Sequence, residues 1–152
     1  MREGDVTVTG DTESWILTFM TDEVLKRRVE QQLDERECPQ FEIETGDAQG
    51  LDRALDQSAW ENTCRTIERL AEEHKVVAML LTHFGTTMNK SFRDHSLYGN
   101  SKMSAEDAKH CRVETCLLMR IFDLMAIAAK FGIKWCLVIP HRDDFAPVSI
   151  LA

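Results

Sequence analysis

Short apolar runs alternate with longer amphipathic stretches along this chain. Four runs predict strands: Trp15 to Phe19, Phe41 to Thr45, Val76 to Leu81 and Ile133 to Ile139. Val6 and Val8 alternate with polar neighbours in the manner of a short edge strand. The six consecutive apolar residues from Val76 to Leu81 predict a strand that is buried on both faces, as in the middle of a parallel sheet.

Three helices are predicted between these strands, each with a recognisable start. One begins at Thr21-Asp22-Glu23 and runs to Arg36, with its apolar side formed by Val24, Leu25, Val29 and Leu33. A second begins at a capping box of Ser58 and Glu61 and ends near His74, with its buried face marked by Trp60, Cys64, Ile67, Leu70 and Ala71. A third begins at Ser104 with Asp107 and ends at Gly132. The residues around Leu51 and Leu55 are expected to form a linker.

Strands that alternate with helices indicate an α/β fold with a mostly parallel sheet of four or five strands and helices on both faces. The length of 152 residues predicts a single domain, residues 1–152. Ligands of open parallel sheets bind beyond the carboxyl ends of the strands. We therefore expect a site where Thr82 to Thr87 approach Pro140 to Asp144, next to a long polar loop that ends near Ser104.

Polar and basic residues after the third strand supply the candidate ligand-binding groups: Thr82, Gly85, Thr86, Thr87, Lys90 and Arg93. The spacing resembles a phosphate-binding loop, but Phe84 and Asn89 occupy both glycine positions of that motif. His83 is a candidate general base, with a hydrogen-bonded residue at the rim of the core as the alternative. His141, after the last strand, is the second catalytic candidate.

Charge and cysteine content narrow the possible partners. The net charge of −8 argues against a broad nucleic-acid-binding face, and leaves only the local basic loop with Lys90, Arg93 and Lys102 for such contacts. The five cysteines are odd in number and lie in apolar context, which predicts reduced thiols and an intracellular, reducing compartment. Their spacing predicts no metal site. The polar amino terminus indicates no signal peptide, and charged residues interrupt the longest apolar run, so no membrane span is expected.

From about Leu55 onward the chain resembles DNA-methyltransferase-like domains with a Rossmann-type fold. In that family a buried strand ends in Pro-Pro-Cys-Gly-Thr-aromatic-Ser, a basic loop follows, and a long helix leads to a strand that ends in Glu-Asn-Pro. The matching residues here are Gly85-Thr86, Arg93, Gly99, Met103-Ser104, Glu114 and Pro140. Phe84 stands at the position of the nucleophilic cysteine, Thr82 and His83 replace the two prolines, and Val138-Ile139 replace Glu-Asn.

A weaker likeness connects residues 51–96 with the ATPases of hexameric replicative helicases. Thr82-His83-Phe84-Gly85 and Arg93-Asp94-His95-Ser96 are similar to two of their motifs, but no phosphate loop precedes them.

The resemblance to DNA methyltransferases, with its substituted catalytic positions, implies a methyltransferase-like domain that has lost its catalytic residues and acts as a binding or structural subunit, in a larger assembly. Met20-Thr21 after the first strand replaces the glycines of a cofactor site, so no cofactor is predicted and S-adenosylmethionine is disfavoured. A protein partner or a homo-oligomer is expected. The alternative is an active enzyme that uses the turn from Thr82 to Ser91 on a nucleotide or another phosphate-bearing small molecule.

Overall fold

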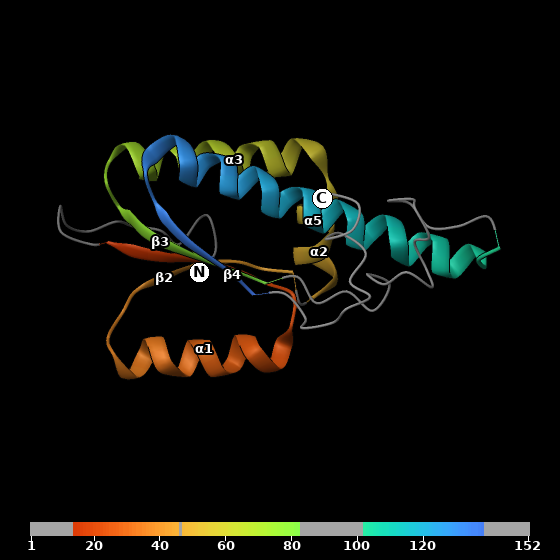
Figure 1. Cartoon of the computed structure of the whole chain (residues 1–152), viewed down its shortest axis with the longest axis horizontal. Coiled ribbons are helices and arrows are strands. Elements are labelled where there is room, and N and C mark those ends of the chain that lie inside the picture. The colour runs from red at the N-terminus through yellow and green to blue at the C-terminus, as the bar shows by residue number, and fades with distance from the viewer. Residues whose placement is uncertain (1–13, 46, 83–101, 139–152) are drawn as a thin grey trace.

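The computed structural model describes residues 14–45, 47–82 and 102–138, and these residues form one parallel sheet with helices on both faces (Figure 1). The strands are β1 (Trp15–Met20), β2 (Gln40–Ile43), β3 (Val76–Thr82) and β4 (Lys134–Val138). Helix α1 (Glu23–Glu35) lies on one face, while α2 (Ala48–Leu55), α3 (Gln57–Glu72) and α5 (Ala105–Phe131) lie on the other. The predicted α/β fold class is confirmed.

The order of the strands in the sheet is β2-β1-β3-β4, and every neighbouring pair is parallel. The chain leaves β1 toward β2 on one side, whereas β3 pairs with the opposite side of β1. The direction of winding therefore reverses between β1 and β3. In open parallel sheets a crevice at the carboxyl ends of two such strands is the common location of a ligand site.

The main hydrophobic core lies between the sheet and the helices α3 and α5. Its most deeply buried large side chains are Trp15, Leu17, Phe19, Trp60, Ile67, Met79, Leu81, Ile121 and Leu124. The rings of Phe19 and Trp60 meet edge to face with centroids 5.9 Å apart, and Trp15 stacks on Phe41 at 6.1 Å. Such aromatic pairs add stability beyond the area that they bury, and they hold β1 against both α3 and β2.

Strand β3 is less enclosed than its sequence predicts. Val76, Met79 and Leu81 are buried, but Val77 is 50% exposed and Leu80 is only partly buried. The register with β1 shifts between Trp15 and Ile16, which places an irregularity beside Val77. Within the described residues, α1 is the only helix on the Leu80 side of the sheet, so burial on both faces was a wrong prediction for part of this strand.

The helix boundaries correct two further predictions. The expected linker around Leu51 and Leu55 is helix α2, whose amino terminus is capped by Asp47. The cap of α3 is Asp56, because its carboxylate accepts the Ala59 amide at 2.7 Å, and Ser58 already lies inside the helix. An aspartate directly after a helix serves here as the start of the next one, which a search for a serine capping box misses.

The predicted ends of the long helix are confirmed. The Ser104 hydroxyl accepts the Asp107 amide at 3.1 Å, and Gly132 ends α5 with a left-handed φ of 66°. On α1, in contrast, Val24 is 65% exposed, so it does not belong to the buried side of that helix. Among the described residues no helix combines the length and the apolar character needed to cross a membrane.

A buried arginine connects α5 to the junction between α2 and α3. Arg120 is 8% exposed, and its Nε donates to the carbonyl oxygen of Ala54 at 3.0 Å. Its terminal nitrogens donate to Gln57 Oε1 at 3.0 Å and to the Leu55 carbonyl oxygen at 3.4 Å. The guanidinium also lies over the ring of Trp60, 5.4 Å from the centroid. A charged side chain thus satisfies backbone acceptors where one helix ends and another begins.

Candidate functional site

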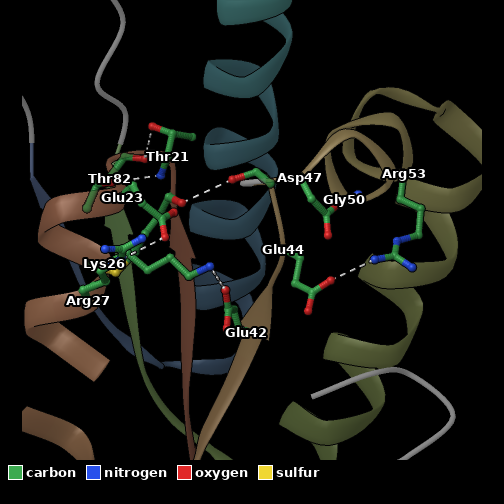
Figure 2. A network of polar contacts seen from close by, with 12 residues as sticks. Thr21, Glu23, Lys26, Arg27, Glu42, Glu44, Asp47, Gly50, Arg53 and Thr82 are labelled. Atoms are coloured by element: carbon green, nitrogen blue, oxygen red, sulfur yellow. Dashed lines mark hydrogen bonds and ion pairs between the residues drawn. The ribbon is translucent and has the colours of Figure 1, made fainter. Parts of the chain in front are cut away.

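The carboxyl ends of β1 and β3 are joined by a pair of hydrogen bonds between two threonines (Figure 2). The Thr21 amide donates to the Thr82 hydroxyl at 3.3 Å, and the Thr21 hydroxyl donates to the Thr82 carbonyl oxygen at 3.4 Å. Thr82 is 1% exposed. The structure thus places this predicted ligand-binding residue at the reversal point of the sheet, with its hydroxyl engaged by the neighbouring strand.

The helix that begins at this edge carries a carboxylate at its amino terminus. Asp22 Oδ1 accepts the Leu25 amide at 2.8 Å and so caps α1 directly after β1. Asp47 caps α2 in the same way by accepting the Gly50 amide (Figure 2). Free amides at a helix amino terminus attract phosphates and other anions. Here a negative side chain already occupies each terminus, so an anionic ligand would be repelled.

A third contact ties the end of β2 to the end of β1. The Thr45 hydroxyl donates to the Met20 carbonyl oxygen at 3.2 Å. Next to it, Arg53 on α2 pairs with Glu44 at 3.1 Å (Figure 2). Helix α2 also lies very close to the backbone of Glu44 at Gly50. Sequence reasoning missed Thr45 and Asp47 as members of this edge. The available signal was their position at and just beyond the end of the strand predicted from Phe41 to Thr45.

A charged cluster of Lys26, Glu30 and Glu42 lies between α1 and β2. Lys26 pairs with Glu42, and both side chains are largely buried (Figure 2). Burial opposes the charge of Lys26, but the hydrogen bond and the negative charge of Glu42 outweigh it and raise the pKa of Lys26 above 10.5. Burial and the nearby carboxylate of Glu42 raise the pKa of Glu30 above 4.5. The cluster therefore holds one carboxyl whose ionisation is disfavoured in the folded protein.

Replacing Glu30 with glutamine is expected to stabilise the protein near neutral pH by a few tenths of a kcal/mol, a small value because Glu30 is partly solvated. A carboxyl whose pKa is higher in the folded than in the unfolded chain stabilises the protein at pH values below its unfolded-state pKa. This stabilisation is lost as the pH rises through the folded-state pKa. Ionised Glu30 is thus a cost at neutral pH that glutamine removes. Urea unfolding should show the difference shrinking toward acid. A gain that does not shrink in acid would contradict the assignment, because it would not arise from the ionised carboxylate.

A groove of about 470 Å³ lies between α3 and α5, with Trp60, Cys64 and Asp123 among its lining residues. The Trp60 indole nitrogen donates to Asp123 Oδ2 at 2.9 Å. Burial, followed by the negative charge of Asp123, raises the pKa of the Cys64 thiol from 9.0 to about 11. Cys64 is therefore a protonated, weakly nucleophilic thiol under ordinary conditions.

Alkylation of Cys64 by iodoacetamide is expected to accelerate with pH up to about 11, the pKa given by its surroundings. Two pKa units above the usual 9.0 correspond to about a hundredfold smaller thiolate fraction below pH 9. Peptide mass spectrometry would follow the rate. Asp123→Asn keeps an acceptor for the Trp60 indole but removes the charge, so it should shift the rate profile to lower pH. An unchanged profile would assign the shift to burial alone.

The other predicted site residues, His83, Gly85, Thr86, Thr87, Lys90, Arg93 and His141, lie outside the described residues. Their roles remain predictions. Of the cysteines, Cys111 is buried as expected for a core thiol, but Cys136 on β4 is exposed, because β4 lies at the edge of the described sheet. Within the described ranges no three histidine, cysteine or acidic side chains are grouped closely enough to hold a metal ion.

No family model, no curated protein and no solved structure matches this chain.

Proposed function

We propose that this chain is a methyltransferase-like α/β domain that no longer catalyses methyl transfer and acts as a binding or structural subunit. The proposal combines two observations. The sequence lacks the cysteine nucleophile of the family that it resembles, with Phe84 in its place. The edge of the sheet where a cofactor would bind carries side chains that satisfy one another.

The observation that carries the proposal is the carboxylate cap on α1. In dinucleotide-binding folds the first strand leads through glycines to a helix whose amino terminus faces the ligand phosphates. Here the strand ends at Met20, Thr21 follows it, and Asp22 accepts the Leu25 amide at 2.8 Å. The Asp22 carboxylate takes up an amide that a ligand would use, including the carboxylate of S-adenosylmethionine, which carries no phosphate. Its negative charge also disfavours the phosphates of a nucleotide.

The threonine pair between β1 and β3 supports the same conclusion. Its two hydrogen bonds of 3.3 and 3.4 Å join the strands where the crevice of an open sheet would begin. A ligand that inserted here would have to replace both bonds with its own polar groups. Because unpaired buried polar groups are costly, such a replacement is favourable only for a closely matched ligand.

The test is a pair of measurements on the full chain. Transfer of a labelled methyl group from S-adenosylmethionine to DNA is expected to be absent, and calorimetric titration with S-adenosylmethionine or ATP should give no saturable heat. Asp22→Ser keeps a helix cap but removes the charge, so a gain of weak ATP binding in that variant would show that the carboxylate excludes the anion. Turnover or micromolar binding by the unaltered chain would overturn the proposal.

The alternative function, an enzyme that acts on a phosphate-bearing small molecule, predicts a different result. If the turn from Thr82 to Ser91 were catalytic, His83→Ala would abolish activity while the melting temperature stayed nearly the same. A large loss of stability would instead assign His83 to the rim of the core.

A further inference from the structure

Strand β4 lies at the edge of the described sheet and exposes apolar side chains. It pairs with β3 on one side, and no described strand lies on its other side. Trp135 is 46% exposed, Val138 is 40% exposed, and Cys136 is exposed. A free strand edge offers a row of unpaired backbone donors and acceptors, and apolar side chains beside it favour pairing with another strand.

The opposite edge of the sheet, strand β2, is built differently. It has four residues, and its polar side chains are Gln40 and Glu42. Glu42 is paired with Lys26 of α1, so a charge is fixed beside that edge. Short, charged edge strands resist pairing with other chains. Of the two edges of the described sheet, β4 is therefore the one better suited to association.

We propose that a second copy of this chain pairs with β4 in antiparallel orientation, about a two-fold axis through Cys136. The two sheets would then join into one continuous sheet across the dimer. This inference does not depend on the proposed function, because it uses the far edge of the sheet and none of the residues at the reversal point.

The side chains of β4 are complementary to themselves in this register. Lys134 lies opposite Val138 of the second copy, and Trp135 lies opposite its Leu137, so no like charges meet. Trp135 and Leu137 share the α5 face of the sheet, since they align with Met79 and Leu81 of the core. Aromatic residues opposite aliphatic ones are favourable cross-strand pairs. A two-fold interface requires such self-complementarity.

The same register places the two Cys136 residues directly opposite each other. Opposed residues of antiparallel strands have Cα atoms about 4.5 or 5.5 Å apart, and both spacings lie within the range of disulfides. Mild oxidation is therefore a direct probe. Copper-phenanthroline with dioxygen would accept two electrons, and two protons would be released, as the two thiols form one bond.

The first experiment is analytical ultracentrifugation of the full chain over a range of concentrations. A monomer–dimer equilibrium is expected, and Trp135→Lys should weaken it about tenfold or more, as for an interface anchor. Val138→Lys provides a second variant at the same edge. Val24→Lys, which changes a side chain that is 65% exposed on α1, is the matched control and should leave the equilibrium unchanged. Melting temperatures would verify that all three variants fold.

The second experiment oxidises the unaltered chain and maps the crosslink by peptide mass spectrometry. A bond between two Cys136 residues is expected, and Cys136→Ser should remove the covalent dimer. A monomer at every concentration would overturn the proposal. So would a dimer that survives Trp135→Lys and Val138→Lys and forms no Cys136 crosslink, because it would use another surface.

Discussion

Arg120→Ala is expected to lower the free energy of unfolding by about 3 kcal/mol. The change removes a buried guanidinium that donates to two backbone carbonyls and to Gln57, and it uncovers one face of Trp60. The carbonyl oxygens of Ala54 and Leu55 would lose these donors at the junction of α2 and α3. Unpaired buried acceptors account for most of the expected cost. Urea denaturation followed by tryptophan fluorescence measures it.

Two variants separate this role from a simple loss of charge. Arg120→Lys keeps the charge but lacks the planar fork that reaches three acceptors, so it should recover only part of the stability. Arg112→Ala changes an exposed arginine on the same helix and should alter stability by about 0.5 kcal/mol or less. If Arg120→Ala and Arg112→Ala had equal effects, the hydrogen-bonded junction would not be a stabilising element.

Gly50→Ala is expected to destabilise the protein by about 2 kcal/mol, through overpacking. A methyl group at this position would lie 2.8 Å from the Glu44 carbonyl oxygen and 2.9 Å from its carbonyl carbon. Backbone atoms cannot move aside as a flexible side chain does, so α2 would have to shift away from the end of β2. The sign of the change in the free energy of unfolding is informative, because a glycine-to-alanine exchange inside an unconstrained helix stabilises the protein by up to about 1 kcal/mol.

The control for Gly50 is Gln49→Ala, one position earlier on the same helix. Gln49 is exposed, and the change is nearly neutral in helix propensity. Thermal unfolding of both variants should therefore show a large decrease for Gly50→Ala and almost none for Gln49→Ala. A stabilised Gly50→Ala variant would mean that the close approach to Glu44 relaxes without cost.

The hydrophobic pattern predicts the strands and the longer helices of this fold because their burial follows a regular period. Trp60, Ile67 and Leu70 recur at helical spacing and are all buried. Helix α2 was missed because it is short and its close-packed position is a glycine, a residue that single-sequence reasoning assigns to turns. The exposure of Val77 could not be predicted either, because no local sequence pattern reveals the shift in register between β1 and β3.

The sequence predicts where β3 ends, but not which contacts form at that end. The apolar run from Val76 to Leu81 correctly predicts that Thr82 lies at the carboxyl end of the strand. Its partner Thr21 is 61 residues away in sequence. Which hydroxyl meets which backbone group depends on the register of β1 and β3, and the sequence alone does not specify that register. The same holds for the buried contacts of Arg120, whose acceptors lie on two other helices.

The central position of β1 also governs when the sheet can form during synthesis. In the sequence β1 is followed first by its partner β2, whereas its other partner, Val76–Thr82, comes only after two more helices. Until then one side of β1 has no strand beside it, and the core side chains Leu17 and Phe19 lack Met79 and Leu81. Long-range parallel pairing of this kind folds slowly. A nascent chain that stops before Val76 is therefore expected to be sensitive to protease, and resistance should appear only after β3 has left the ribosome.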